Sequence, residues 1–423
     1  MKTWTILMNP DKEILQMMKD SRWIYDQALY HQRQKFFETQ KEGKIKTFNF
    51  KELYHIVSQT DEYKEMRLDS VLKSGALRQL FSNWNGYIRS VMQYKKHPEK
   101  FIKRPKLPNY ICRKSEFNLV QIDKTRFRSK GCRKNEIRLP NSNVKIRIPE
   151  QIERKSIREL TIKYYHGKIK VGIVFDENSE KIKYDCDSNL SVGVDIGLNN
   201  LMAITSNDKP FSYVVNGRPL KSINQFYHKQ KSLLKSNLDK CNKKSKTSKR
   251  LENLERKRTE KISHYFHCVS KQIIELCVSY GVSRIIIGHN IGWKQNVSLG
   301  SRTNQSFVSI PFNRLIEQIK DKARKYEGLE VRIVEESYTS KTDHLSLEEM
   351  IHQDSLKGKR VKRGLFQSSV GKLVNADVNG ALNIMRKVVG DSEIVSRIIN
   401  SGRLFRPLKF NNLYSLKNIE VYK

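Results

Sequence analysis

The sequence predicts a mixed α and β protein, with an α/β domain in its second half and a β unit carrying an inserted helical unit in its first half. Three observations support this prediction. Apolar residues recur at helical spacing between residues 11 and 100, alternating strand patterns follow residue 101, and short apolar runs preceded by helical patterns occur after residue 188. Strands that alternate with helices are typical of an α/β domain.

The first half begins with a strand that ends at Pro10. Helical periodicity then runs from Leu15 to Leu29 and again from Val71 to Ile88, until prolines end it. The segments Val144–Ile148 and Ile169–Val174 alternate as antiparallel strands do. We expect a small β-barrel or sheet with the helical unit inserted after its first strand. The expected boundaries are 1–10 and 101–187 for the β unit and 11–100 for the insertion.

The second half opens with the apolar strand that ends in Asp195, followed by a second strand at 201–205. Residues 285–287 and 331–334 are typical of buried parallel strands. Two long helices are expected within 225–277, joined by an almost purely cationic tip. The α/β domain is expected to span 188–423, with a basic C-terminal tail at 390–423.

The charge of the chain indicates its partner. Its 423 residues hold 81 Lys and Arg against 44 Asp and Glu, a formal net charge of +37. Such a surplus favours a polyanion on the surface, either nucleic acid or an anionic membrane. The chain has no apolar run of about 18 residues and no signal-peptide core. We therefore expect a nucleic-acid partner and a cytoplasmic, nucleoid-associated protein.

The six cysteines contain no Cys-x-x-Cys pair. Neither a disulfide framework nor a cysteine zinc site is indicated, and zinc is expected to be absent.

Two aspartates are candidate metal ligands. Asp195 ends an apolar strand, and open α/β sheets place their chemistry beyond the carboxyl ends of their strands. A solvated Asp that starts a β-turn with Gly197 is the alternative interpretation. Asp377 lies at a helix start, where an Asp is often only a cap. Two acids aimed at one spot repel unless a cation joins them, and such a pair suits metal-dependent phosphodiester hydrolysis.

A third acid is expected from another strand end. The strand at 285–287 supplies none, whereas Glu335 and Glu336 follow the strand at 331–334. If the strand at 331–334 lies one strand further from Asp195 than the strand at 285–287, its acid must reach about 5 Å further, and a Glu side chain can do so. Adjacent strand residues point to opposite faces, so one of the two would face the site. A surface Glu pair is the alternative.

Clusters of basic residues are the candidate nucleic-acid contacts, because phosphate contacts dominate affinity for nucleic acid. A solvated charged face is the alternative interpretation. The candidates are Lys243, Lys244, Lys246, Lys249, Arg250, Lys359, Arg360, Lys362 and Arg363.

Several ordered motifs between about Phe101 and Met385 resemble those of one family. They are Asp195-Ile196-Gly197, the segment 216–225, Trp293-Lys294-Gln295, the segment 304–307, Ile310-Pro311-Phe312, the segment 336–341 and the segment 375–381. The sequence resembles TnpB, the transposon-encoded OrfB-type family related to type V CRISPR effectors.

The resemblance implies an RNA-guided DNA endonuclease. It implies a wedge-type β-barrel with a helical recognition insertion, and a RuvC nuclease domain of RNase H-like fold. The implied partners are a guide RNA from the transposon end and double-stranded target DNA next to a short motif. Cutting would depend on Mg²⁺ or Mn²⁺. Asp195 matches the first RuvC acid and Asp377 the last.

Two departures from the family pattern matter. Most relatives carry the middle acid after the strand that here ends in Gly288, so Glu336 is expected to be a relocated replacement. Its spacing before Thr339-Ser340-Lys341 favours it, with Glu335 as the alternate. Most relatives also carry four zinc-binding cysteines after that motif, whereas here no cysteine follows Cys277. Residues 342–372 are then expected to be a metal-free insertion with a basic loop.

Two other functions are compatible with these motifs. The chain could bind guide and target without cutting, as a repressor or a regulator of transposition. A transposase that transfers DNA strands is a third possibility.

Overall fold

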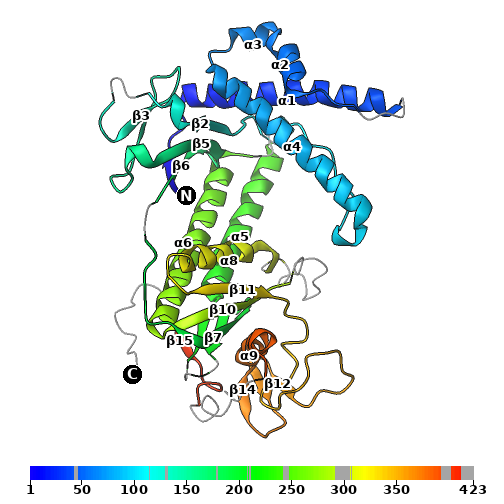
Figure 1. Cartoon of the computed structure of the whole chain (residues 1–423), viewed down its shortest axis with the longest axis vertical. Coiled ribbons are helices and arrows are strands. Elements are labelled where there is room, and N and C mark those ends of the chain that lie inside the picture. Colours follow the sequence, from blue (N-terminus) through cyan, green and yellow to red (C-terminus); the bar gives the residue numbers. More distant parts are fainter. Residues whose placement is uncertain are drawn as a thin grey trace. The chain divides into compact units, whose positions relative to one another are not determined.

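The computed structural model describes residues 1–41, 46–113, 115–128, 132–177, 180–206, 208, 211–241, 247–290, 305, 307–391 and 402–410. The chain divides into two compact units, Met1–Asn178 and Ser179–Lys423 (Figure 1). The predicted mixture of helices and sheets is confirmed. Within the described ranges, no helix has both the length and the apolar character needed to span a membrane.

The described residues of the first unit form two antiparallel sheets and four α-helices. Its elements are β1 (Lys2–Met8), α1 (Lys12–Lys41), α2 (Phe50–Ser58), α3 (Asp61–Glu65), α4 (Ser70–Lys96), β2 (Val120–Asp123), β3 (Glu136–Arg138), β4 (Lys145–Arg147), β5 (Ile157–Tyr165) and β6 (Lys168–Phe175). One sheet has the order β1-β6-β5-β2, and β3 pairs with β4 in the other. The strand pairs of the described residues make these two sheets, and a closed barrel stays a prediction.

Helix α1 begins where its sequence supplies a cap. The side chain of Asp11 accepts hydrogen bonds from the backbone N–H of Glu13 and of Ile14, at 2.9 and 3.2 Å. These bonds satisfy amides that have no partner inside the helix. The apolar stripe of α1 packs against α4, where Leu77 and Trp84 are buried. The helical periodicity therefore reflects a core between these helices.

The second unit is built on a six-stranded sheet. Its elements are β7 (Asp187–Ile196), β8 (Asn200–Ser206), β9 (Ser212–Asn216), α5 (Arg218–Lys240), α6 (Lys249–Ser279), β10 (Val282–Gly288), α8 (Phe312–Ala323), β11 (Glu330–Val334), β12 (Lys359–Lys362), β13 (Leu365–Gln367), β14 (Leu373–Asn375), α9 (Ala376–Val389) and β15 (Leu408–Phe410). The strand order is β11-β10-β7-β8-β9-β15. Strands β7, β8 and β9 form an antiparallel meander, while β10 runs parallel to β7 and β11 parallel to β10.

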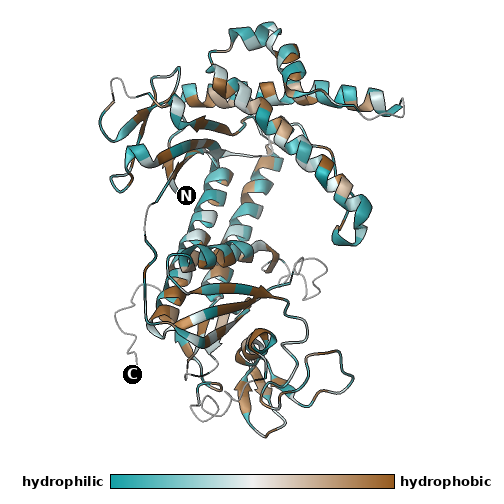
Figure 2. Ribbon diagram, in the orientation of Figure 1, coloured by the Kyte–Doolittle hydropathy of each residue, from teal (hydrophilic) through white to brown (hydrophobic). Residues whose placement is uncertain are grey.

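Helices cover both faces of this sheet, with α6 and α8 on one face and α9 on the other (Figure 1). On β10, Ile285 and Ile287 join the core formed with α6 and α8, whereas Ile286 joins the core formed with α9. Burial on both faces explains why residues 285–287 of β10 are continuously apolar, as Figure 2 shows. The expected burial of residues 331–334 is wrong, because β11 lies at the edge of the sheet and leaves Arg332 and Ile333 exposed.

Two segments differ from their predicted form. Helix α5 begins at Arg218 rather than at residue 225, because Pro219 occupies its first turn, where a helix tolerates proline. The expected basic loop within 342–372 contains strands β12 and β13, which pair antiparallel through a turn at Gly364. Gly364 has a φ of 82°, which glycine adopts without strain.

Candidate functional site

Asp195 lies near the carboxyl end of β7, on the face that α9 covers. Helix α9 approaches β7 closely because two contact positions are glycines. A Cβ placed on Gly193 would collide with the carbonyl oxygen of Ala381, and one on Gly380 would lie 2.7 Å from Asp195 Oδ2. The two glycines therefore let the helix lie directly against the carboxylate.

Asp377 lies in the first turn of α9 but does not cap the helix. Asn375 is the cap, since its Oδ1 accepts from the backbone N–H of Asp377 at 3.0 Å and of Val378 at 3.3 Å. The Asp377 carboxylate instead accepts from Asn200 Nδ2 at 2.6 Å, from the first residue of β8. Asp377 is thus free of the usual structural role of a helix-starting Asp.

The two glutamates after β11 point in different directions. Glu335 is exposed and accepts a hydrogen bond from Ser337 Oγ at 2.6 Å. Glu336 is partly buried, and its Cβ would lie 3.3 Å from a Cβ placed on Gly288, at the end of β10. Burial raises the pKa of Glu336, and the Lys387 ammonium opposes that rise. The structure therefore turns Glu336 inward and Glu335 outward.

The charges of Asp377 and Glu336 both act on Asp195. Burial, then the charges of Asp377 and Glu336, raise the pKa of Asp195 to about 8, while Arg360 acts to lower it. Within the described part of the chain, no three His, Cys, Asp or Glu side chains are close enough together to hold a metal ion as they stand. Asp377 and Glu336 are thus near enough to Asp195 to affect its pKa, but the three carboxylates do not surround a common metal position.

The donor chemistry of these acids suits a hard divalent cation. Asp195, Asp377 and Glu336 offer carboxylate oxygens, the ligands that Mg²⁺ and Mn²⁺ prefer. Burial is the main cause of the raised pKa of Asp195, and the charges of Asp377 and Glu336 add to it, an effect that a cation would oppose.

A cavity of about 740 Å³ opens beside Asp377. Four cationic side chains line it together with Asn200: Arg218, Lys221, Arg360 and Arg363. Cationic side chains next to these carboxylates would bind the phosphates of a nucleic-acid strand and hold that strand beside the acids.

The predicted basic residues have different surroundings. Lys359, Arg360, Lys362 and Arg363 are exposed on β12 and the following turn, and two of them reach the cavity beside Asp377. Lys249 and Arg250 are exposed at the start of α6. Lys243, Lys244 and Lys246 lie outside the described residues.

The segment after Thr342 is held by a buried polar network. The Asp343 carboxylate is fully buried and accepts from Ser368 Oγ at 2.8 Å and from the Ser369 N–H at 2.7 Å. His344 is buried beside Asn383, and burial lowers its pKa to about 4. The side chains of Asn379 and Asn383 on α9 bond to the backbone of His344 and Thr342, and so connect this segment to the helix.

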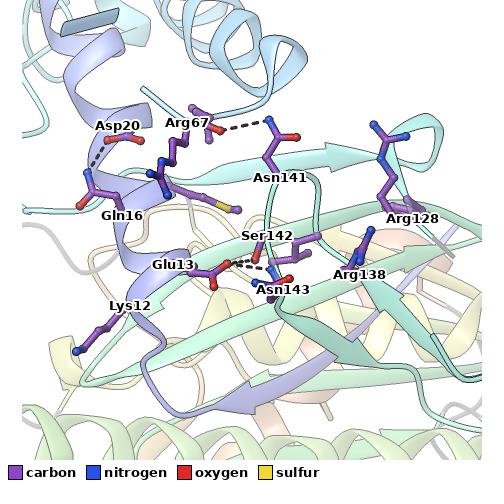
Figure 3. Close-up of a pocket in the computed structure, with 14 residues that line it drawn as sticks. Lys12, Glu13, Gln16, Asp20, Arg67, Arg128, Arg138, Asn141, Ser142 and Asn143 are labelled. Carbon is purple, nitrogen blue, oxygen red and sulfur yellow. Dashed lines mark hydrogen bonds between the residues drawn. The ribbon is translucent and has the colours of Figure 1, made fainter. Parts of the chain in front are cut away.

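A second candidate site lies in the first unit (Figure 3). This cavity of about 960 Å³ is lined by Lys12, Gln16, Arg67, Arg128 and Arg138, among others. One wall is fixed by Glu13, whose carboxylate accepts from Ser142 Oγ at 2.6 Å and from the Asn143 N–H at 3.0 Å. The combination of guanidinium and amide groups suits phosphates and base edges.

Sequence reasoning missed several of these residues. Asn200 and Lys387 carry no local signal, and Gly380 appears only as part of the motif 375–381, because the roles of all three depend on how α9 packs on the sheet. The turn Asn141-Ser142-Asn143 was the one available signal for the cavity in the first unit, since such clusters mark loops.

Comparison with known proteins gives two family matches. Residues 175–294 match the OrfB_IS605 family, described as a probable transposase. Residues 312–384 match the Cas12f1-like TNB domain.

Two individual proteins are similar over most of the chain. The TnpB-like protein ORF457 of Acidianus two-tailed virus is 22% identical over an alignment of 414 residues, gaps included, and the match covers 90% of this chain and 84% of the viral protein. A Cas12f1 chain, solved by cryo-electron microscopy in complex with sgRNA and target DNA, aligns over 88% of this chain and 83% of its own. The TM-score is 0.54 at 16% sequence identity, so the likeness is one of fold.

Proposed function

We propose, from the premise that this chain is a TnpB-type protein, that it is an RNA-guided DNA endonuclease. The observation that carries the proposal is the coupling of Asp195, Asp377 and Glu336 at the end of β7, the strand in the middle of the sheet. Nucleic-acid partners are supported by the +37 charge and by the fold shared with a Cas12f1 chain solved with sgRNA and target DNA.

The proposed domains follow the sequence boundaries. Residues 188–423 would form a RuvC nuclease domain, for which an RNase H-like order is supported by the antiparallel meander followed by two parallel strands. Residues 1–10 and 101–187 would form a wedge domain, and 11–100 the helical recognition insertion. The cavity of Figure 3 would then contact nucleic acid in the first unit.

Each residue of the site has a proposed role. Asp195, Asp377 and Glu336 would hold Mg²⁺ or Mn²⁺, and Asn200 would orient Asp377 through its 2.6 Å hydrogen bond. Lys221, Arg360 and Arg363 would bind the phosphates of the strand to be cut. Bound there, the cations would supply an activated water and stabilise the leaving oxygen.

The proposal is tested by purifying the protein with its RNA and sequencing that RNA. A discrete RNA that ends in transposon-flanking sequence is expected. DNA that matches its end should be cut when Mg²⁺ is present and left whole when EDTA is added. RNA of random sequence would contradict guide binding.

A binding protein without nuclease activity is the second candidate function. It is favoured by the observation that no three acids of the described residues enclose a metal position. A complex that binds its guided target but never cuts it, with Mg²⁺ or Mn²⁺ present, would establish this alternative.

A further inference from the structure

Side chains from two other elements hold the turn that carries Glu336. Lys387 of α9 donates from Nζ to the carbonyl oxygens of Glu335 at 2.8 Å and of Ser337 at 2.9 Å. Asn290, which follows β10, accepts from the backbone N–H of Glu336 through Oδ1 at 2.8 Å. The backbone groups on both sides of Glu336 are therefore held from outside the turn.

The position of β11 explains why this turn must be held. Strand β11 is at the edge of the sheet, and β10 lies between it and β7. The Glu336 carboxylate must reach across β10 toward Asp195, and neighbouring strands are about 5 Å apart. A glutamate side chain has several rotatable bonds, so its direction depends on a fixed backbone. The end of β10 lies close to Glu336, since a Cβ added at Gly288 would lie 3.3 Å from the Cβ of Glu336.

The same bonds select between the two neighbouring glutamates. With the carbonyls of Glu335 and Ser337 turned to Lys387, the side chain of Glu335 is exposed and that of Glu336 is partly buried. Rotation of this turn would exchange the two side chains.

Lys387 also links the turn to the other acids. It lies on α9 ten residues after Asp377, which is a rise of about 15 Å along a helix. Gly380 of the same helix contacts Asp195. One rigid element therefore carries Asp377, touches Asp195 and holds the turn of Glu336.

We infer that Lys387 and Asn290 are positioning residues that aim the Glu336 carboxylate at Asp195 and Asp377. The inference rests on the proposed nuclease function, because it assigns these residues to the metal-binding acids. Neither residue contacts the nucleic acid in this proposal. Lys387 is exposed, so its replacement should change the fold's stability little.

The test compares Lys387→Met, which removes the donors, with Lys387→Arg, which keeps them. Lys325→Met, at another exposed lysine, is the matched control. Mn²⁺ binding to each full-length protein with its RNA is followed by the electron paramagnetic resonance signal of free Mn²⁺. Guided cleavage is measured over a series of Mg²⁺ concentrations, together with target binding and Tm.

Lys387→Met should weaken Mn²⁺ binding about 10- to 100-fold, as loss of groups that orient metal ligands typically does. The same substitution should raise the Mg²⁺ concentration needed for half-maximal cutting by a similar factor. Target binding and Tm should stay at the parent's values. Lys387→Arg should recover most of the affinity, and the control should match the parent. If Lys387→Met unfolds, Asn290→Ala takes its place with the same expected loss.

Equal Mn²⁺ affinity in the parent and in Lys387→Met would overturn the inference, as would an arginine variant no better than the methionine one. A parent that binds Mn²⁺ but never cuts a guided target would refute the nuclease function alone, because the Mn²⁺ comparison still tests the positioning role. A parent that binds no Mn²⁺ would overturn both.

Discussion

At Asp195, burial and the neighbouring carboxylates act in the same direction, since both favour the protonated carboxyl. An ordinary Asp ionises near pH 3.9, whereas here the pKa is about 8. Without a cation, the folded protein thus retains a proton that the unfolded chain has already lost. Stability should therefore be greatest below pH 4 for this group and should fall as the pH rises toward 8.

We predict that Asp195→Asn removes the loss of stability that the parent suffers as the pH rises. In EDTA, the Tm of the parent should fall between pH 5 and pH 8, and the Tm of the variant should fall less. Each 1 kcal/mol of relief corresponds to about 2–4 °C for a unit of this size. Thermal denaturation at the two pH values measures it. Identical pH profiles of Tm would show that the pKa of Asp195 is nearly the same in the folded and the unfolded protein.

Glu336 and Glu335 form a matched pair for the catalytic assignment. Glu336→Gln should abolish guided cutting and retain target binding, because metal-binding acids act as a unit. Glu335→Gln should cut like the parent, since its side chain is exposed. Cleavage and binding assays on the same preparations decide between them. The reverse result would move the middle acid to Glu335.

At the scale of elements, the contact between α9 and β7 depends on glycine. Gly193 faces the backbone carbonyl of Ala381, and a backbone atom cannot move aside as a flexible side chain can. Glycine at position 193 therefore sets the distance between α9 and β7, and with it the distance between Asp377 and Asp195.

We expect Gly193→Ala to destabilise the protein by about 1–3 kcal/mol or more, the usual range for overpacking a core. Gly86→Ala is the matched control, since Gly86 lies within α4 with nothing within 4 Å of an added Cβ. It should leave stability unchanged or raise it by up to about 1 kcal/mol. Urea denaturation of both variants measures the difference. A Gly193→Ala protein as stable as the parent would mean that α9 can shift freely.

At the scale of the whole molecule, the +37 charge should control binding. Affinity for nucleic acid should fall steeply with salt, because each neutralised phosphate releases counterions. Replacing Lys359 and Lys362 by Gln should reduce the slope of log K against log salt by up to about 2. Lys325→Gln should leave the slope unchanged. A salt titration of binding provides the measurement, and a flat response in the parent would remove the electrostatic argument.

Residues whose role depends on local pattern could be predicted from the sequence. Asp195 stands near the end of an apolar strand, and the helix start around Asn375 has a capping pattern. Residues whose role depends on packing could not be predicted. The bond from Asn200 to Asp377 joins side chains 177 positions apart, and the bonds of Lys387 require α9 to lie beside the end of β11. The strand pairing of β12 and β13 was also missed, because a run of cations is typical of a loop.

The concentration of these contacts on α9 bears on how such a protein could lose its cutting activity. A helix turns about 100° per residue, so one inserted or deleted residue between Asp377 and Gly380 would rotate everything beyond it to another face. Gly380 and Lys387 would then lose their partners together, while the cationic surfaces elsewhere in the chain would be untouched. Under the proposed nuclease function, a single codon gained or lost between Asp377 and Gly380 would therefore be enough to abolish cutting.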